Sequence, residues 1–162
     1  MEEQSQNIKT ISAVMILLIL GVGFVLFGKY RNSNGNTNDK SAIVMVENTL
    51  MTGGVLLAPA GFPQEIPLEG GEILESATTQ YPEQNTKQLS VSYQSSKTIT
   101  QKYAEYRDYM TASGYQITKE GAGSPAKIIF GTKNNADLSV VVSSSEGGTL
   151  VQLSYLLKSI VE

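Results

Sequence analysis

The sequence of 162 residues contains no cysteine, no histidine and no tryptophan, and each absence removes a class of chemistry. Without Cys there are no disulfides, no thiolate nucleophiles and no Cys-based zinc sites. Without His there is no imidazole for a Ser–His pair, for proton transfer near neutral pH or for common transition-metal sites. An enzyme of this composition would depend on Lys, Tyr or carboxylates for proton transfer. We therefore expect a non-catalytic protein that carries no cofactor.

Basic residues are too few and too scattered to support binding to nucleic acid. The chain has a formal net charge of −3. From residue 41 to residue 162 there are eight Lys or Arg residues against twelve Asp or Glu residues, a balance of −4. Nucleic-acid binding depends on clustered Lys and Arg side chains that neutralise phosphates. The sequence has no such cluster, so we expect no nucleic-acid partner.

Charge is absent altogether from one long segment near the N-terminus. Residues 10–28 read TISAVMILLILGVGFVLFG, nineteen residues without a charge. A helix of this length extends for about 28 Å at about 1.5 Å per residue, close to a hydrocarbon core of about 30 Å. The run is apolar on every side, which suits lipid better than packing against one core. Residues 10–28 are therefore predicted to be a transmembrane helix in contact with membrane lipid, preceded by a short tail over residues 1–9.

The ends of this run have the features of membrane-interface anchors. Basic side chains reach the headgroups, and Tyr prefers the interface. A cleaved signal peptide would need a shorter apolar stretch and a small-residue cleavage site, and GFVLFGKYR offers no such site. A lipoprotein anchor would need a Cys, which the sequence lacks. The residues predicted to end the anchor are Ile11, Phe27, Lys29, Tyr30 and Arg31.

The two flanks of the run give conflicting indications of its orientation. The C-terminal flank has more positive charges, Lys29, Arg31 and Lys40, than the N-terminal flank, which has Lys9 and the amino terminus. This excess favours a cytoplasmic C-terminal flank. A short tail before a large domain is instead typical of an uncleaved signal anchor, and large domains cross membranes largely regardless of charge. We predict a single-pass plasma-membrane protein of the cell envelope with an extracytoplasmic C-terminal domain, against the charge count.

Two segments separate the apolar run from the rest of the chain. Residues 29–41 are predicted to be a flexible linker, because residues 31–41, RNSNGNTNDKS, include no apolar side chain and cannot bury enough surface to fold. Residues 42–61 are predicted to be an extended pre-domain arm, and the pattern leaves strand, helix and loop open. The arm either docks on a membrane partner or wraps onto the following domain as an edge strand or cover. We favour the second interpretation.

Residues 62–162 are predicted to form a small soluble α+β domain. Alternating apolar and polar residues indicate strands, and clusters of Gly, Pro and Asn indicate turns. Short connections suit antiparallel pairing. The expected order is β-β-α-β-β-β-β, a mainly antiparallel sheet with one helix packed on one face. Strands are expected near residues 73–80, 87–94, 115–119, 127–132, 137–143 and 149–158.

The one expected helix of this domain runs from about residue 98 to residue 113. Thr98 and Gln101 form a capping-box pair at its start. Gly114 is placed to adopt the left-handed conformation that ends many helices, which would fold the next residue back onto the helix. Apolar residues at helical spacing form one buried stripe: Ile99, Tyr103, Tyr106 and Met110. Charged residues are expected to lie away from that stripe: Lys102, Glu105, Arg107 and Asp108.

Three stretches of the domain are distinctive: FPQEIPLEGGEI at 62–73, M-x-x-S-G-Y at 110–115 and G-G-x-x-V-x-L-x-Y at 147–155. Together they resemble a widespread, mostly uncharacterised bacterial domain that is carried on membrane-anchored proteins and lipoproteins. That family opens close to P-x-x-(V/I)-P-x-Y-P-G-A, and its helix usually carries an F-Y pair and ends in G-W. Here Glu105-Tyr106 and Gly114-Tyr115 stand in those places, and the Tyr-Pro-Gly-Ala part is replaced. The resemblance implies an exported sheet-plus-helix domain and brings no catalytic residues.

An acidic stretch at the start of the domain provides the one candidate metal site. Carboxylates are hard oxygen ligands that suit calcium. The stretch lacks the D-x-D-x-D-G spacing of a calcium loop, and alternating Glu residues on strands usually form a solvated face. The candidate ligands are Glu65, Glu69, Glu72, Glu75 and Glu83.

These features predict a membrane-anchored envelope protein that presents a small non-catalytic interaction domain. Its partner is expected to be another protein of the envelope, contacted through exposed strand edges or through the apolar arm at residues 54–62. An alternative is a sensor domain that binds a ligand or calcium through the acidic stretch. A third is an enzyme that works without His or Cys.

Overall fold

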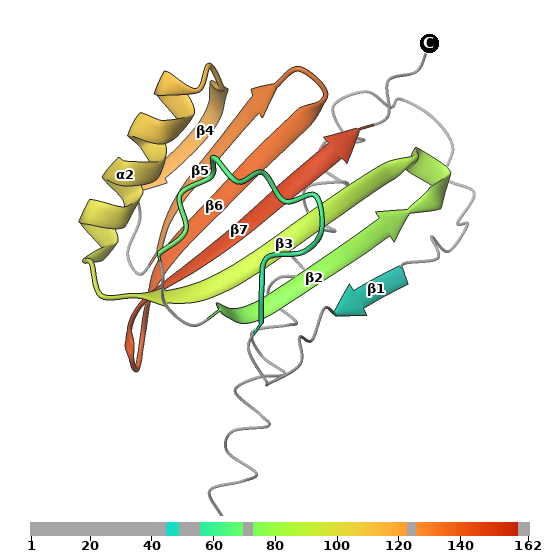
Figure 1. Ribbon diagram of the computed structural model, residues 1–162. Helices are drawn as coiled ribbons and strands as arrows, with labels where there is room; N and C mark the ends of the chain where they lie inside the picture. The colour runs from blue at the N-terminus through green and yellow to red at the C-terminus, as the bar shows by residue number, and fades with distance from the viewer. Residues whose placement is uncertain (1–44, 49–55, 70–72, 123–125, 159–162) are drawn as a thin grey trace, which may run out of the picture. The chain divides into compact units, whose positions relative to one another are not determined.

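The computed structural model describes residues 45–48, 56–69, 73–122 and 126–158 (Figure 1). Every described residue belongs to one compact unit, residues 42–162. The transmembrane helix predicted at 10–28, its anchor residues and the linker at 29–41 lie outside the described residues. No helix formed by the described residues is long and apolar enough to cross a membrane.

The described residues form an antiparallel sheet with one α-helix on it. Its six longer strands and the helix follow the predicted order β-β-α-β-β-β-β. The strands lie side by side in the order β1-β2-β3-β7-β6-β5-β4. The helix α2, Ile99–Ala112, packs over β4, β5 and β6 (Figure 1). A short strand β1 at Met45–Asn48 adds to one edge of the sheet. The six longer strands are β2 Ile73–Tyr81, β3 Thr86–Ser95, β4 Gln116–Ala122, β5 Ala126–Lys133, β6 Ala136–Ser145 and β7 Gly148–Lys158.

The strands lie close to where the alternation of side chains predicted them. The turn between β2 and β3 is a 3-10 helix at Pro82–Gln84 followed by Asn85 in the left-handed conformation, φ +48°. Asn134 takes the same conformation, φ +53°, between β5 and β6. Asn tolerates positive φ, which is why it marks both reversals. The clearest difference is at β4, which extends through Gly121 and Ala122 where a loop was expected.

One face of the sheet carries the hydrophobic core. Side chains on neighbouring strands oppose one another in three rows, and the nine residues in them are apolar or aromatic. Because successive side chains alternate between faces, this pairing places all nine on the side of α2. The rows are Leu89, Tyr155 and Leu138; Val91, Leu153 and Val140; and Tyr93, Val151 and Val142.

A second, irregular segment covers the same face beside the helix. We call residues 56–69 the strap; they cross in front of β7 and β3 in Figure 1. Phe62 and Ile66 are 7% and 2% exposed, and the ring of Phe62 meets that of Tyr155 edge-on at 6.5 Å between centroids. Ala58 and Leu68 pack against the same cluster. Within residues 42–61, the described part therefore consists of strand β1 and the first part of the strap. The domain boundary expected at residue 62 lies inside a packed segment.

Local signals at both ends of α2 were correctly predicted from the sequence. The Thr98 hydroxyl accepts a hydrogen bond from the Gln101 backbone N–H at 3.3 Å, and the Gln101 side chain accepts one from the Thr98 N–H at 2.9 Å. At the other end Gly114 has φ +80°. The Tyr115 N–H donates to the Met110 carbonyl at 2.8 Å, and the Gly114 N–H donates to the Thr111 carbonyl at 3.2 Å. These two bonds are the Schellman pattern that ends a helix.

The helix buries the predicted stripe and one residue more. Tyr106 and Met110 are fully buried, and Ile99 and Tyr103 are half-buried against the core. Lys102 was expected to face solvent, and this prediction was wrong: its side chain is 0% exposed. A buried ammonium requires partners, because leaving charge without hydrogen bonds in a protein interior is costly.

Candidate functional site

The acidic stretch does not assemble into a metal site among the described residues. Glu65 is exposed and Glu69 half-buried in the strap, whereas Glu75 lies on β2, where its carboxylate accepts a hydrogen bond from the Ser92 hydroxyl at 3.3 Å. Glu72 and the side chain of Glu83 lie outside the described part. Within that part, no three or more Asp, Glu, His or Cys residues lie close enough together to hold a metal ion.

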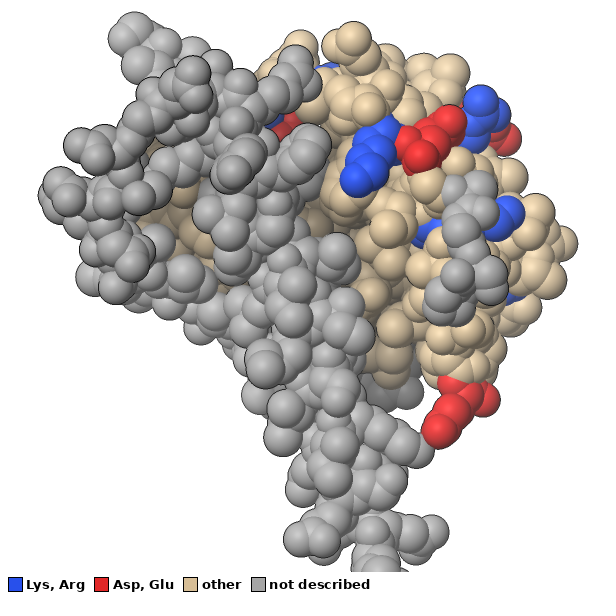
Figure 2. Space-filling model, turned by 180° about the vertical axis from the view of Figure 1, so that it is seen from behind, with Lys and Arg blue, Asp and Glu red and all other residues tan. Residues whose placement is uncertain are grey.

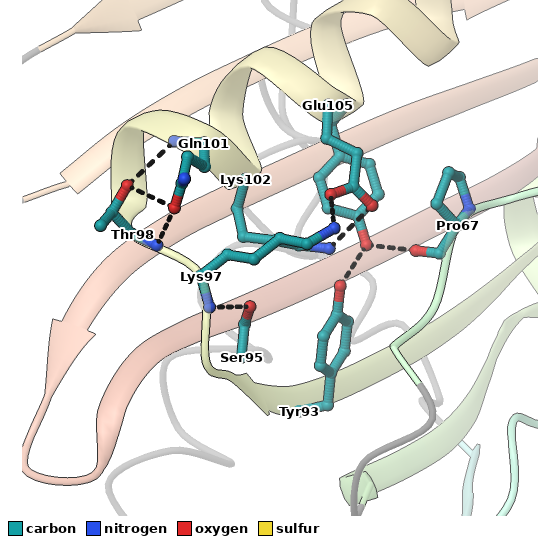
Figure 3. Close-up of polar contacts among 9 residues, drawn as sticks. Pro67, Tyr93, Ser95, Lys97, Thr98, Gln101, Lys102 and Glu105 are labelled. Atoms are coloured by element: carbon teal, nitrogen blue, oxygen red, sulfur yellow. Dashed lines mark hydrogen bonds and ion pairs between the residues drawn. The ribbon is translucent and has the colours of Figure 1, made fainter.

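The main cluster of ionisable groups lies instead around Lys102, at the start of α2 (Figure 3). The Lys102 ammonium nitrogen lies 5.3 Å from the centroid of the Tyr93 ring and 5.0 Å from that of the Tyr106 ring. It donates to Oε1 of Glu105 at 3.0 Å. The Lys97 ammonium donates to Oε2 of the same carboxylate at 2.6 Å. Two aromatic faces and one carboxylate therefore take the place of water around a buried cation.

A second chain of hydrogen bonds joins this cluster to the strap. The Tyr106 hydroxyl donates to the Pro67 carbonyl at 2.5 Å. The Tyr93 and Tyr106 hydroxyl oxygens are 2.7 Å apart. Because Tyr106 gives its one proton to Pro67, Tyr93 must be the donor in that pair. Burial raises the pKa of Tyr106 far above its ordinary value, and the neighbouring Tyr93 raises it further. The Tyr106 hydroxyl therefore stays protonated at any physiological pH.

The carboxylate between the two lysines stays ionised. Partial burial works to raise the pKa of Glu105, but hydrogen bonds from Lys97 and Lys102 outweigh it and hold that pKa below the ordinary value. The hydrogen bond to Glu105 likewise raises the pKa of Lys97. The shifted pKa values of Tyr106, Glu105 and Lys97 thus hold each of these three groups in its ordinary charge state. A general acid or base needs the opposite, a pKa moved toward neutrality.

A shallow open depression at the other end of the sheet also lacks a catalytic pair. It lies between the β2–β3 turn and the end of β7 and is lined by Gln80, Tyr81, Pro82, Asn85, Thr86, Lys87, Leu157 and Lys158. The Tyr81 hydroxyl donates to the Gln88 side-chain oxygen at 3.2 Å, and burial raises the pKa of Tyr81. The Lys158 ammonium is 2.5 Å from an Asp137 carboxylate oxygen.

The sheet face opposite α2, which we call the serine face, is built mainly from hydroxyl and amide side chains. Ser90 on β3 opposes Ser154 on β7, and Ser154 opposes Ser139 on β6. In the next row Ser92 opposes Gln152, and Gln152 opposes Val141. The row continues beyond Ser139 to Phe130 on β5. Both α2 and the strap pack on the other side of the sheet (Figure 1).

Comparisons with protein-family models, with curated proteins and with solved structures find no match to this chain. The resemblance to a bacterial membrane-anchored domain therefore stays a prediction. On the side of the domain shown in Figure 2, most of the described surface is uncharged, and Lys or Arg side chains lie beside Asp or Glu. That side shows no broad basic patch in its described part.

The Glu105 ion pairs predict a specific pH dependence of folding. Because the pKa of Glu105 is lowered in the folded state, its ion pairs stabilise the fold above the unfolded pKa. That contribution is lost as the pH falls through the folded pKa. Urea unfolding of the wild type and of Glu105→Gln, from about pH 6 to about pH 3, should show a stability difference that shrinks with acid. A difference that stays constant over this range would contradict the assignment.

Proposed function

We propose that this chain is a single-pass membrane protein of the cell envelope whose C-terminal domain is a non-catalytic interaction module. The supporting observation is the uncharged run of nineteen residues at 10–28, followed by a polar linker. Such a run is long enough to cross a bilayer and has no basic or acidic residue to keep it in water. Downstream of the linker, the described residues form a hydrophobic core between the sheet, α2 and the strap.

The non-catalytic part of the proposal is supported by how the ionisable side chains are used. The Tyr93 and Tyr106 hydroxyls form a hydrogen bond with each other, and Tyr106 also bonds to the strap backbone. Lys102 pairs with Glu105. These contacts join the helix, the sheet and the strap. The side chain of Lys102 has no exposed surface and is enclosed by the rings of Tyr93 and Tyr106 and by the carboxylate of Glu105. Groups that satisfy one another in this way hold a fold together and leave no free nucleophile or base for a substrate.

The surface proposed for a protein partner is the outer edge of β4. Among the described strands, β4 pairs only with β5, so its other side presents backbone N–H and C=O groups to an added strand. Gln116 and Thr118 are exposed there. The apolar arm expected as an alternative at 54–62 is less suitable, because Pro59 and Phe62 are buried within its described part.

Fractionation of cells tests the anchoring. The full-length chain is expected to stay in the membrane pellet after a high-pH carbonate wash and to enter solution only with detergent. Protease added to intact cells is expected to remove the C-terminal domain, since the proposal places it outside. A chain that is soluble without detergent would overturn the anchor. A domain protected until the cells are lysed would overturn the orientation alone.

Site-specific crosslinking tests the partner. A photo-reactive amino acid at Gln116, on the β4 edge, is expected to give a covalent adduct of one defined mass in intact membranes. The control position is Thr111, which is equally exposed but lies on α2. Adducts from both positions, or from neither, would mean that the β4 edge is not the contact surface.

A further inference from the structure

Three half-buried tyrosines, which we call the tyrosine cluster, lie where α2 ends: Tyr109 on α2, Tyr115 just after it and Tyr155 on β7. The ring centroids of Tyr109 and Tyr115 are 6.2 Å apart, and the ring planes are inclined by 45°. A Cβ atom placed on Gly131 would lie 3.2 Å from the Cβ of Tyr115, so Tyr115 lies over β5. Leu138 opposes both Gly131 and Tyr155, which places Tyr155 two strands away, at about 10 Å.

One exposed carboxylate lies close to all three rings. Glu65 belongs to the strap, at the tip of a turn in which the Ile66 N–H donates to the Pro63 carbonyl at 3.3 Å. Burial raises the pKa of each tyrosine in the cluster, and the negative charge of Glu65 raises each pKa further. A charge acts on a pKa in this way only from nearby. Within the described part of the chain Glu65 makes no ion pair or hydrogen bond, so its charge is open to an added cation.

One cation already lies against this cluster. Lys133, the exposed last residue of β5, has its ammonium nitrogen 5.7 Å from the centroid of the Tyr115 ring, which is within the range of a cation–π contact. Lys133 has no ion pair with any described residue, so the ring itself is its contact there. The Tyr115 ring therefore presents a face that a solvated cation can reach. A guanidinium is less strongly hydrated than an ammonium and stacks on such faces.

We propose that the tyrosine cluster and Glu65 bind an arginine side chain of a protein partner. The guanidinium replaces the Lys133 ammonium on the Tyr115 ring and pairs with the Glu65 carboxylate. Its planar set of N–H donors suits a carboxylate and the phenol oxygens beside it. Tyr and Arg are also the residues that contribute most at protein interfaces.

Other ligands suit this place less well. A quaternary ammonium would pack on the rings, but it has no N–H group to donate to the Glu65 carboxylate or to the phenol oxygens. An anion would be repelled by Glu65, and the one cation described beside the cluster, Lys133, already lies on a ring. The charge and the hydrogen-bonding groups of the site therefore favour a cation that carries several donors.

This inference rests on the proposed function in one respect: it names the chemistry of the expected protein partner. Binding is measured separately from location and from the β4 edge. The full-length chain, with ¹³C-labelled tyrosine rings, is kept in dodecyl maltoside, an uncharged detergent, and titrated with the blocked peptide acetyl-Gly-Arg-Gly-amide while NMR spectra are recorded. A chain soluble without detergent would be titrated in buffer, so failure of the anchor and failure of the arginine site are distinguishable.

The ring signals of the tyrosine cluster are expected to shift saturably with the arginine peptide, while those of Tyr81 on β2 stay in place. A citrulline peptide, which has the same shape without the charge, should cause no shift. Glu65→Gln is expected to weaken binding about tenfold, the effect of losing a hydrogen bond to a charged group, and to leave the melting temperature unchanged. The matched control Asp108→Asn removes the same charge from an exposed residue of α2 and should bind as the wild type does. Lys133→Gln should tighten binding, because it vacates the Tyr115 ring.

Several results would overturn the inference. They are equal shifts with the citrulline peptide, equal weakening by Glu65→Gln and Asp108→Asn, and weaker binding by Lys133→Gln than by the wild type. Tighter binding of free arginine than of the peptide would show a small-molecule site and not a protein contact. If the same ring signals moved with the concentration of the chain alone, a second copy of the chain would be the occupant.

Discussion

Replacing Phe62 by Ala should lower the free energy of unfolding by about 3–5 kcal/mol, the usual range for a buried Phe. The ring is 7% exposed, and it packs edge-on against Tyr155 of the central strand β7. Ile66, Ala58 and Leu68 also pack against the core, and the Pro67 carbonyl accepts a hydrogen bond from Tyr106. The strap's described backbone bonds include two local turns, Phe62 to Pro59 and Ile66 to Pro63. Side chains therefore hold the strap on the sheet, and Phe62 contributes much of that contact.

The same segment provides a matched control for Phe62→Ala. Leu57 is 47% exposed, and Leu57→Ala should change stability by no more than about 0.5 kcal/mol. Urea unfolding followed by far-UV circular dichroism is the suitable measurement, because the chain has no Trp to report by fluorescence. If Phe62→Ala cost as little as Leu57→Ala, the strap would be a loose cover and the folded unit would begin after it.

The strap is also where prediction from the sequence fell short. The residues 86–95 and much of 148–158 follow a two-residue period with turn residues at their ends, so local pattern alone places their strands. The strap has no period, because its side chains are fixed by contacts with strands far away in the sequence. Pro67 meets Tyr106 across 39 positions, and Phe62 meets Tyr155 across more. No window of local sequence contains that information.

The burial of Lys102 was missed for a different reason. Lys102 follows Ile99 by three residues and precedes Tyr106 by four, so helical spacing alone would have placed it beside the buried stripe, although it was predicted to lie away from it. Its charge alone argued for solvent, since Lys is seldom fully buried unless paired. The deciding signal was the Glu three residues later, Glu105, which can pair with it on the same side of the helix. The Tyr93 ring that completes its surroundings comes from β3, which the helix sequence cannot show.

The serine face shows a different limit of prediction from the sequence, because it depends on how the strands pair. The strand register places Ser90, Ser92 and Ser154 on the side away from the core, as the alternation of apolar and polar residues in β3 and β7 suggests. The register itself was not predictable, because alternation shows on which face a side chain lies but not which residue of the neighbouring strand it opposes. Only pairing shows that Ser90, Ser154 and Ser139 share one row and that Gln152 lies between Ser92 and Val141. A row of hydroxyls across strands is a property of the folded sheet.

The second large effect is expected at the buried ion pair, and it depends on which partner is removed. Glu105→Ala takes away the one carboxylate bonded to Lys102 and leaves an ammonium with no exposed surface. Loss of one partner of a buried pair costs about 3–5 kcal/mol. The carboxylate side chain is itself 29% exposed, so solvent screens it in part and the lower end, about 3 kcal/mol, is expected. Thermal or urea unfolding measures the loss directly.

The reverse substitution should be mild. Lys102→Met keeps a long flexible side chain between the rings of Tyr93 and Tyr106, where a thioether makes favourable contacts. Glu105 retains Lys97, whose ammonium lies 2.6 Å from Oε2, so no charge is left alone. Replacing a buried charge by an apolar residue of similar size is often neutral or stabilising, and the change should stay within about 1 kcal/mol.

The double variant, Lys102→Met with Glu105→Ala, then tests whether the role of Lys102 is structural. With Lys102 already replaced by Met, Glu105→Ala removes only a surface pair with Lys97 and should cost about 1 kcal/mol or less. The two substitutions are therefore strongly non-additive, with a coupling of about 2 kcal/mol. Additive costs would mean that Glu105 stabilises the helix by some other route. In that case the carboxylate of Glu105 would not be what stabilises the buried charge of Lys102 between the two tyrosines. The fold would then not require that charge.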